Sequence, residues 1–196
     1  MSKVLIATVY GPDPVLTAAN KLGPDRLVLL VDIKPSKEQE NSLDLIKKSL
    51  GRVIDVKVVK TEVYDIVDIA KKAVEVIDLQ PNEDEIYINI TSGRKTKAIG
   101  LLFGAYARYE RIKKIIYYPE EKGLSPIFLP KLQFNLTESQ KKVLELLDSK
   151  EYKSLSELAD QVEQSTAMLY RNIKELKEMG LVEDLKLTDA GKIARL

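Results

Sequence analysis

A turn rich in hydroxyl-bearing and cationic residues occupies positions 89–100, which read NITSGRKTKAIG. The apolar segment DEIYINI leads into this turn, and KTKAIGLLFGAYARYE continues it with a helical pattern. Gly93 would let the backbone approach a ligand closely. The side chains of the turn that could bind an anion are Thr91, Ser92, Arg94, Lys95 and Lys97.

The residues of this turn permit two interpretations. Backbone amides at a helix N-terminus and the helix dipole attract anions. Cations at that end are unfavourable unless an anion lies between them and the helix, so the turn predicts a phosphate-binding site. The alternative is an ordinary strand–helix turn with solvated cations. Neither the G-x-x-x-x-G-K-[ST] loop nor the G-x-G-x-x-G loop occurs here, so these common phosphate motifs do not explain the turn.

A second loop, TVYGPDP at 8–14, follows the first predicted strand. In a doubly wound sheet, ligands bind beyond the carboxyl ends of the strands, where the strand order reverses. The first and fourth strands usually flank that point, so we expect the two loops to form one site. Gly11 permits an unusual turn, Pro12 stiffens the helix entry and Tyr10 could stack on a base. We also assign Thr8 to this ligand site.

The elements that must position these loops alternate between strands and amphipathic helices over residues 1–130. Helical patterns lie at about 14–22, 36–50, 65–79 and 96–109. Apolar, β-branched runs predict strands at 4–9, 26–31, 53–59, 85–90 and 114–118, with a short edge strand at 125–130. This alternation predicts right-handed βαβ units, and hence an α/β domain with a mostly parallel, Rossmann-like sheet.

A second, smaller domain is predicted at 131–196, after the proline-flanked segment LPKLQFN. Thr137 would cap its first helix, Ser156 would open a short second helix, and Gly180 would end a longer third helix. A tight turn near 163–165 and a hairpin-like stretch after the third helix complete the pattern of a winged helix-turn-helix. In such modules the third helix enters the major groove of DNA with its N-terminal half. The outward residues expected to contact DNA are Ser165, Thr166, Ala167, Met168, Tyr170, Arg171 and Lys174.

Composition excludes several classes of chemistry. The chain of 196 residues contains no cysteine and no histidine, which excludes disulfides, thiolate metal sites, cysteine nucleophiles and Ser-His-Asp catalysis. We therefore expect no metal and no cofactor. No run of about 18 apolar residues and no signal-peptide pattern occurs, so we expect a cytoplasmic protein without a membrane partner. Residues 134–196 carry ten Lys or Arg and twelve Asp or Glu, so a protein-binding domain is the alternative to a DNA-binding one.

The combination of these features resembles the CRISPR-associated Rossmann-fold (CARF) transcription regulators of archaea over nearly the whole chain. The most specific element is a turn of the type [ND]-x-[ST]-x-G-x-[RK], met here by Asn89, Thr91, Gly93 and Lys95. The segment VYGPD after the first strand matches more loosely. The resemblance implies a homodimer that binds a cyclic oligoadenylate across its two-fold axis. It also implies that paired winged helices bind double-stranded DNA at a CRISPR-related promoter or leader.

The resemblance also guides the choice of ligand. Across the implied two-fold axis, two copies of Arg94, Lys95 and Lys97 would bring six cations to a ring of phosphates. A cyclic tetranucleotide has matching two-fold symmetry. Cyclic tetra-adenylate is therefore the first choice of ligand and cyclic hexa-adenylate the second, and this choice rests on the family rather than on residue spacing.

Two alternatives to a ligand-responsive transcription regulator remain open. Some members of the family cleave the ring, which needs no histidine when a ribose 2′-OH is held in line with its phosphate. Ser92 and Lys95 would then be the catalytic residues, whereas the regulator interpretation assigns none. The other alternative is a ligand-sensing adaptor whose winged helix binds protein. The operator, the direction of regulation and the sign of coupling between ligand and DNA are not fixed by the sequence.

Overall fold

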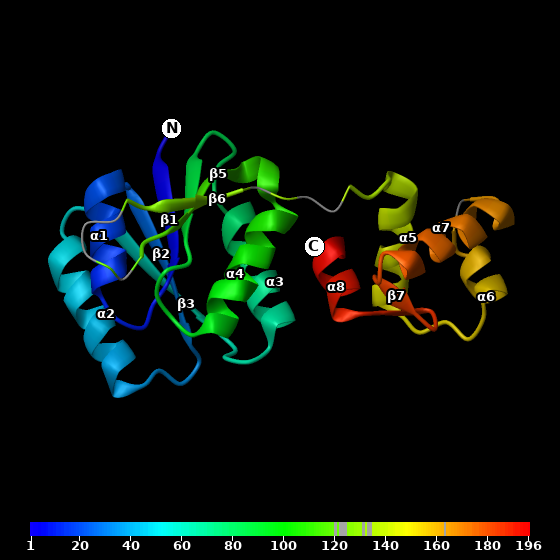
Figure 1. Cartoon of the computed structure of the whole chain (residues 1–196), viewed down its shortest axis with the longest axis horizontal. Helices are drawn as coiled ribbons and strands as arrows, with labels where there is room; N and C mark the ends of the chain where they lie inside the picture. Colours follow the sequence, from blue (N-terminus) through cyan, green and yellow to red (C-terminus); the bar gives the residue numbers. More distant parts are fainter. Residues whose placement is uncertain (120, 122–124, 131, 133–134, 163) are drawn as a thin grey trace. The chain divides into compact units, whose positions relative to one another are not determined.

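The computed structural model describes residues 1–119, 121, 125–130, 132, 135–162 and 164–196. The chain divides into two compact units, Met1–Leu132 and Gln133–Leu196, where the sequence predicts a division between residues 130 and 131. Figure 1 shows the α/β elements of the first unit and the mostly helical elements of the second. None of the helices in the described parts of the chain is long and apolar enough to cross a bilayer.

The described residues of the first unit form a six-stranded sheet in the order β3-β2-β1-β4-β5-β6. β1 to β5 run parallel, and β6 pairs antiparallel with β5 at one edge. The predicted Rossmann-like α/β fold is thereby confirmed. The order reverses between β1 and β4, so the carboxyl ends of these two strands mark the expected ligand-binding position. The strands are β1 (Lys3–Thr8), β2 (Arg26–Asp32), β3 (Asp55–Thr61), β4 (Glu85–Asn89), β5 (Ile112–Tyr117) and β6 (Ile127–Leu129).

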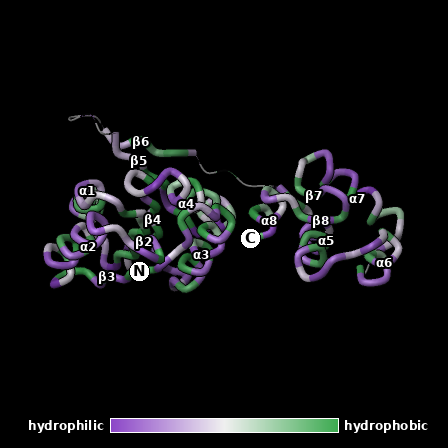
Figure 2. Tube along the Cα trace, turned by 90° about the horizontal axis from the view of Figure 1, so that it is seen from below, coloured by the Kyte–Doolittle hydropathy of each residue, from purple (hydrophilic) through white to green (hydrophobic). Residues whose placement is uncertain are grey.

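Two of the described helices cover each face of this sheet. α1 (Asp13–Leu22) and α2 (Lys37–Leu50) pack into one hydrophobic core, and α3 (Ile66–Asp78) and α4 (Lys95–Ala107) pack into the other. The strand β2 reads RLVLLVD and is buried after its first residue, as expected for a parallel strand covered on both faces. The edge strand β6 is different, because most of it is exposed although it is hydrophobic (Figure 2).

Helix α4 lies close against α3 because two of its residues lack a side chain. A Cβ on Gly100 would lie 2.6 Å from the Cβ of Ile69. A Cβ on Gly104 would lie 2.6 Å from the Cβ of Ala73. This close packing fixes the rotation of α4 about its own axis. It therefore decides which residues in the first turn of α4 face the sheet and which face solvent.

The described residues of the second unit form three helices, a two-stranded hairpin and a final helix. As predicted, Thr137 caps the first helix, where it forms a reciprocal capping box with Gln140. The second helix begins earlier than predicted, because Ser154 rather than Ser156 supplies the capping hydroxyl. These elements are α5 (Glu138–Ser149), α6 (Leu155–Ala159), α7 (Thr166–Glu178), β7 (Val182–Glu183), β8 (Lys186–Leu187) and α8 (Asp189–Arg195).

The end of α7 leads directly into the hairpin. Gly180 adopts a left-handed conformation with φ of 72° just after the helix, as the sequence predicts for a glycine at a helix C-terminus. The hairpin turns at Asp184 and Leu185, which also have positive φ, of 44° and 59°. Two consecutive positive φ values match the right-handed twist of a two-residue hairpin. The predicted turn before α7 includes Glu163, which lies outside the described residues.

Candidate functional site

The loops after β1 and β4 are joined by hydrogen bonds. The Ser92 hydroxyl accepts a bond from the Tyr10 amide at 2.9 Å and donates to the Gly11 carbonyl at 3.2 Å. The Thr8 hydroxyl donates to the Ser92 carbonyl. Thr8 and Ser92 are both buried. The two loops thus lie side by side as expected, and these hydroxyl groups hold the loops together rather than facing solvent.

Both the backbone conformation at position 93 and the lack of space around it require a glycine. Its φ of 94° lies in a region that residues with a side chain rarely adopt. A Cβ at this position would lie 2.9 Å from the Cβ of Thr8, closer than real Cβ contacts allow. Gly93 therefore brings the turn before α4 into direct contact with the end of β1.

Asn89 and Thr91 shape the same turn from within. The Asn89 side chain accepts bonds from the Thr91 amide at 3.0 Å and the Thr91 hydroxyl at 2.6 Å. Its own amide group donates to the Pro14 carbonyl at 3.2 Å. The Thr91 hydroxyl also accepts a bond from the Tyr118 amide at 2.8 Å. Asn89 is fully buried, so these two motif residues connect the turn to α1 and to the end of β5.

The N-terminus of α4 has no side-chain cap. Arg94 occupies the N-cap position with φ of −67° and ψ of 147°, but no described side chain accepts a bond from the first-turn amides. The hydroxyl of Thr96 points elsewhere and donates to the Val63 carbonyl at 2.6 Å. The first turn of α4 therefore presents amides and the positive end of the helix dipole without a protein acceptor that caps them.

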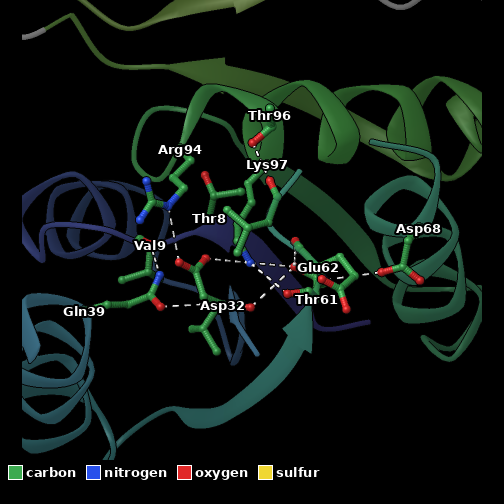
Figure 3. Close-up of polar contacts among 12 residues, drawn as sticks. Thr8, Val9, Asp32, Gln39, Thr61, Glu62, Asp68, Arg94, Thr96 and Lys97 are labelled. Atoms are coloured by element: carbon green, nitrogen blue, oxygen red, sulfur yellow. Dashed lines mark hydrogen bonds and ion pairs between the residues drawn. The ribbon is translucent and has the colours of Figure 1, made fainter. Parts of the chain in front are cut away.

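The position of Lys97 corrects the expectation of three exposed cations. Its side chain is 0% exposed, and its Nζ lies 3.0 Å from Oδ1 of Asp32. The same Nζ donates to the hydroxyl of Thr61 at 2.6 Å (Figure 3). Burial lowers the pKa of Lys97, while the Asp32 carboxylate acts in the opposite direction. Lys97 lies three residues before Gly100 and therefore on the same face of α4, the face that packs against α3.

The same buried polar cluster includes Asp32, Thr61 and Gln39, which no sequence motif predicted as site residues. Asp32 ends β2, the neighbour of β1, and Thr61 ends β3, where it pairs with Asp32 on the other side of β2. Gln39 accepts a bond from the Asp32 amide at 3.1 Å and donates to the Val9 carbonyl at 2.7 Å. One signal was available, because an acidic residue ends the otherwise apolar run LVLLVD and parallel strands carry their sites at that end.

Three predicted site residues reach solvent: Tyr10, Arg94 and Lys95. The Nε of Arg94 lies 3.4 Å from Oδ2 of Asp32, and the Arg94 side chain is 42% exposed. The pKa of Tyr10 is raised, chiefly by a hydrogen bond with Glu38. Gly11 and Pro12 are half-buried beneath this surface. The site thus combines two exposed cations, an aromatic ring and an uncapped helix N-terminus, which suits an anion with an attached ring system.

Nothing in the described residues resembles a metal site, since no three acidic side chains gather there. The chain also contains neither histidine nor cysteine. The buried hydroxyls and Lys97 are occupied by protein partners, so the chemistry open to a ligand is electrostatic attraction, hydrogen bonding and stacking. This set of groups is suited to binding an anion.

The residues that we assigned to DNA all lie on the exposed side of the second unit. Ser165 accepts a bond from the Met168 amide and so caps α7. Two cations of α7 have acidic partners one turn further on: Arg171 Nε lies 2.8 Å from Glu175 Oε1, and Lys174 Nζ lies 3.8 Å from Glu178 Oε1. The full set of exposed residues is Ser165, Thr166, Ala167, Met168, Tyr170, Arg171 and Lys174.

Comparison with known proteins gives two family matches and several similar folds. The family described as HFX_2341_N-like, N-terminal matches residues 4–122, and the family HVO_A0114 matches residues 135–194. No curated protein sequence matches the chain.

Several solved structures resemble the chain, among them three with TM-scores above 0.5. Csm6 of Enterococcus italicus, bound to cyclic hexa-2′-fluoro-hexa-dAMP, is 17% identical with a TM-score of 0.53, covering 93% of this chain and 57% of that one. Can2 of Sulfobacillus thermosulfidooxidans, in complex with cyclic tetra-adenylate, is 13% identical with a TM-score of 0.52, covering 98% and 63%. A type III CRISPR defence DNA nuclease activated by cyclic oligoadenylate is 16% identical with a TM-score of 0.51, covering 91% and 30%.

These likenesses show a common fold, and the chain spans less than two thirds of the length of each of these proteins. The family match is more specific, because it covers more than half of the chain and includes both loops of the candidate site. The protein therefore belongs to the HFX_2341_N-like, N-terminal family.

Proposed function

We propose that the chain is a CARF-type transcription regulator, in which the first unit binds a cyclic oligoadenylate and the second binds DNA. The observation that carries the ligand proposal is the uncapped N-terminus of α4, which begins with Arg94 and Lys95 at the point where the strand order reverses. Solved structures of the same fold hold cyclic tetra-adenylate in one case and cyclic hexa-2′-fluoro-hexa-dAMP in another, which supports this class of ligand.

The proposed contacts follow from what the site leaves exposed. Arg94 and Lys95 bind phosphate oxygens, together with the first amides of α4. Tyr10 stacks on an adenine, since its ring is exposed beside Arg94. Thr8, Asn89, Thr91, Ser92 and Gly93 shape the two loops, and Lys97 supports them from beneath.

The ligand binds across the two-fold axis of a homodimer in this proposal. Two copies of Arg94 and Lys95 then supply four exposed cations, rather than the six counted when Lys97 is included. Four cations match the four phosphates of cyclic tetra-adenylate, which remains the first choice, with cyclic hexa-adenylate second. The prediction is a dimer in solution, which sedimentation velocity measures directly.

Isothermal titration calorimetry of the whole protein with cyclic tetra-adenylate tests the ligand proposal. We expect binding by the wild type and a loss of at least a hundredfold in the Arg94→Ala/Lys95→Ala variant, because charged hydrogen bonds contribute about 1.5–3 kcal/mol each. The matched control is Lys47→Ala/Lys48→Ala, which removes the same charge from the last turn of α2. No binding by the wild type, or equal losses in both variants, would refute the proposal.

The DNA part of the proposal rests on α6, α7 and the β7–β8 hairpin, whose order matches a helix-turn-helix followed by a wing. The exposed Tyr170 and Arg171 lie on the N-terminal half of α7, the part that would enter the major groove. A gel-shift assay with DNA from upstream of the protein's own gene tests this assignment. Tyr170→Ala and Arg171→Ala should weaken the shift, while Lys177→Ala in the last turn of α7 should not.

A partner protein rather than DNA remains the alternative for this second unit, because acidic residues oppose the cations of α7. If no DNA from that region shifts, the adaptor interpretation replaces the regulator. Ring cleavage has less support, since the hydroxyl of Ser92 is bonded to both Tyr10 and Gly11. Incubation with radiolabelled ring should therefore yield no linear product, and a linear product would overturn this assignment.

A further inference from the structure

Three charged side chains form one cluster beneath the proposed ligand surface. Asp32 contacts Lys97 with one carboxylate oxygen, at 3.0 Å, and Arg94 with the other, at 3.4 Å. Lys97 is 0% exposed, Asp32 is 5% exposed in its side chain and Arg94 is 42% exposed. Figure 3 shows the two cations on opposite sides of the Asp32 carboxylate. Only one of the three, Arg94, can reach a ligand in solvent.

We propose that Lys97 and Asp32 are positioning residues that keep Arg94 available for an anion. Lys97 neutralises the buried carboxylate, so that Asp32 orients Arg94 without holding it tightly. This inference rests on the proposed function, because it assumes that Arg94 binds a phosphate. It goes beyond that function, because Lys97 would influence the affinity for the ligand without contacting the ligand.

The geometry supports this division of roles. The Lys97 ammonium forms an ion pair with Asp32 and donates a hydrogen bond to Thr61, and it is excluded from water, so the Asp32 charge is matched within the protein. Arg94 meets Asp32 only through Nε, at a distance near the upper limit for a hydrogen bond. Within the described residues, the terminal Nη1 and Nη2 of Arg94 make no hydrogen bond, whereas Nε does. These two nitrogens form the planar fork that binds phosphate in a bidentate manner.

Removing the Lys97 charge should change which group neutralises Asp32. The Met side chain in Lys97→Met has a similar length but no ammonium group. Of the three clustered side chains, Arg94 is then the one cation beside the buried Asp32 carboxylate. A buried carboxylate without a partner is strongly unfavourable, so Asp32 should bind the Arg94 guanidinium tightly and withdraw it from solvent. The net charge of the cluster falls from +1 to 0. Adding Asp32→Asn to this variant restores the net charge to +1 and releases Arg94.

The first experiment measures the affinity of the whole protein for cyclic tetra-adenylate by calorimetry. We expect Lys97→Met to lower the affinity about tenfold, the size of one lost charge-assisted bond. The double variant Asp32→Asn/Lys97→Met should bind within about threefold of the wild type. A second mutation that restores binding is not expected if Lys97 only stabilises the fold. Equal affinity of Lys97→Met and wild type, or no recovery in the double variant, would overturn the inference.

The second experiment separates positioning of Arg94 from a simple field effect of the Lys97 charge. In an Arg94→Ala background, Lys97→Met should cost no further affinity, because the group that it repositions is absent. A pure field effect would instead cost the same factor in both backgrounds. Equal losses in the two backgrounds would therefore refute the positioning role.

A ligand-free measurement keeps this inference independent of the proposed ligand. In ¹⁵N-labelled protein, the Nε–Hε signal of Arg94 is identified by its loss in Arg94→Lys. Its hydrogen exchange should slow about tenfold in Lys97→Met and quicken in the double variant. If cyclic tetra-adenylate does not bind but the exchange changes as stated, the ligand proposal fails and the positioning role stands. Unchanged exchange in both folded variants overturns the positioning role whatever the ligand.

Discussion

The N-termini of α4 and α7 share a backbone conformation at the N-cap position but have opposite chemistry. Their N-cap residues have φ and ψ of −67° and 147° in α4, and −65° and 147° in α7. At α7 this residue is Ser165, whose hydroxyl accepts the Met168 amide. At α4 it is Arg94, which caps nothing. The second unit therefore satisfies its own helix end, whereas the first leaves that end open to an external acceptor.

The cations of these two helices also differ in how closely they are paired with carboxylates. Arg171 and Lys174 of α7 each have an acidic partner on the next turn. Near α4, Lys97 takes the shorter contact with Asp32, which leaves Arg94 with a single longer one. Under the proposed function, an anion would bind at α4 without displacing an acceptor from the helix end, whereas DNA at α7 would compete with carboxylates. That function therefore predicts tight ligand binding in the first unit and salt-sensitive DNA binding in the second.

The largest effect is expected where the first unit depends on close packing. Gly93→Ala should lower the free energy of unfolding by roughly 3 kcal/mol, because it combines positive φ with a Cβ against Thr8. Gly180→Ala at the end of α7 also has positive φ but meets nothing within 4 Å, so it should cost only about 1 kcal/mol. Urea denaturation, followed by amide signals of each unit, measures both values. If both variants lost the same free energy of unfolding, the contact with Thr8 would contribute nothing beyond the positive φ.

Exchanging the caps should give smaller effects of opposite sign. Arg94→Ser should stabilise the first unit by about 0.5–1 kcal/mol, since serine caps a helix in this conformation, and should weaken anion binding about tenfold. Ser165→Ala should destabilise the second unit by about 1 kcal/mol without changing anion binding. Amide hydrogen exchange in α4 and α7, with calorimetry in parallel, measures these results. A loss of stability in Arg94→Ser would mean that the contact between Arg94 and Asp32 outweighs the missing cap.

The smallest effect is expected from the ion pairs of α7. Glu175→Gln removes the acidic partner of Arg171, so DNA affinity should rise about two- to threefold, in line with the small energy of exposed pairs. The slope of log affinity against log salt should become steeper, because one more cation binds phosphate. Glu40→Gln on α2 is the control for total charge. If affinity falls instead, Glu175 orients Arg171 toward DNA rather than competing with it.

The sequence predicted the fold well because hydrophobic runs and helix signals agree along most of the chain. The start of β3 was an exception: Val53 and Ile54 look like strand residues but lie in a turn after α2, and the strand begins at Asp55. Apolar type alone does not distinguish these positions. Strand pairing with β2 does, since its register begins at Arg26 and Asp55.

The candidate site was only partly predictable for a related reason. The two loops, their order and their exposed cations follow from local patterns and from the rule on strand reversal. The burial of Lys97 does not, because it depends on how α4 is rotated against α3 by Gly100 and Gly104. The role of Asp32 also required the register of β2 beside β1, which no local pattern contains.

The bonds that Ser92 makes to the loop after β1 have a consequence for the energetics of binding. All of these bonds join residues of one chain, so the loop conformation exists before any ligand or second chain arrives. A loop that is already ordered loses little conformational entropy on binding, and that cost otherwise reaches about 1–2 kcal/mol per residue fixed. The Thr8–Ser92 junction therefore orders the candidate site of one chain in advance, leaving the exposed side chains as the main groups that a bound ligand would immobilise.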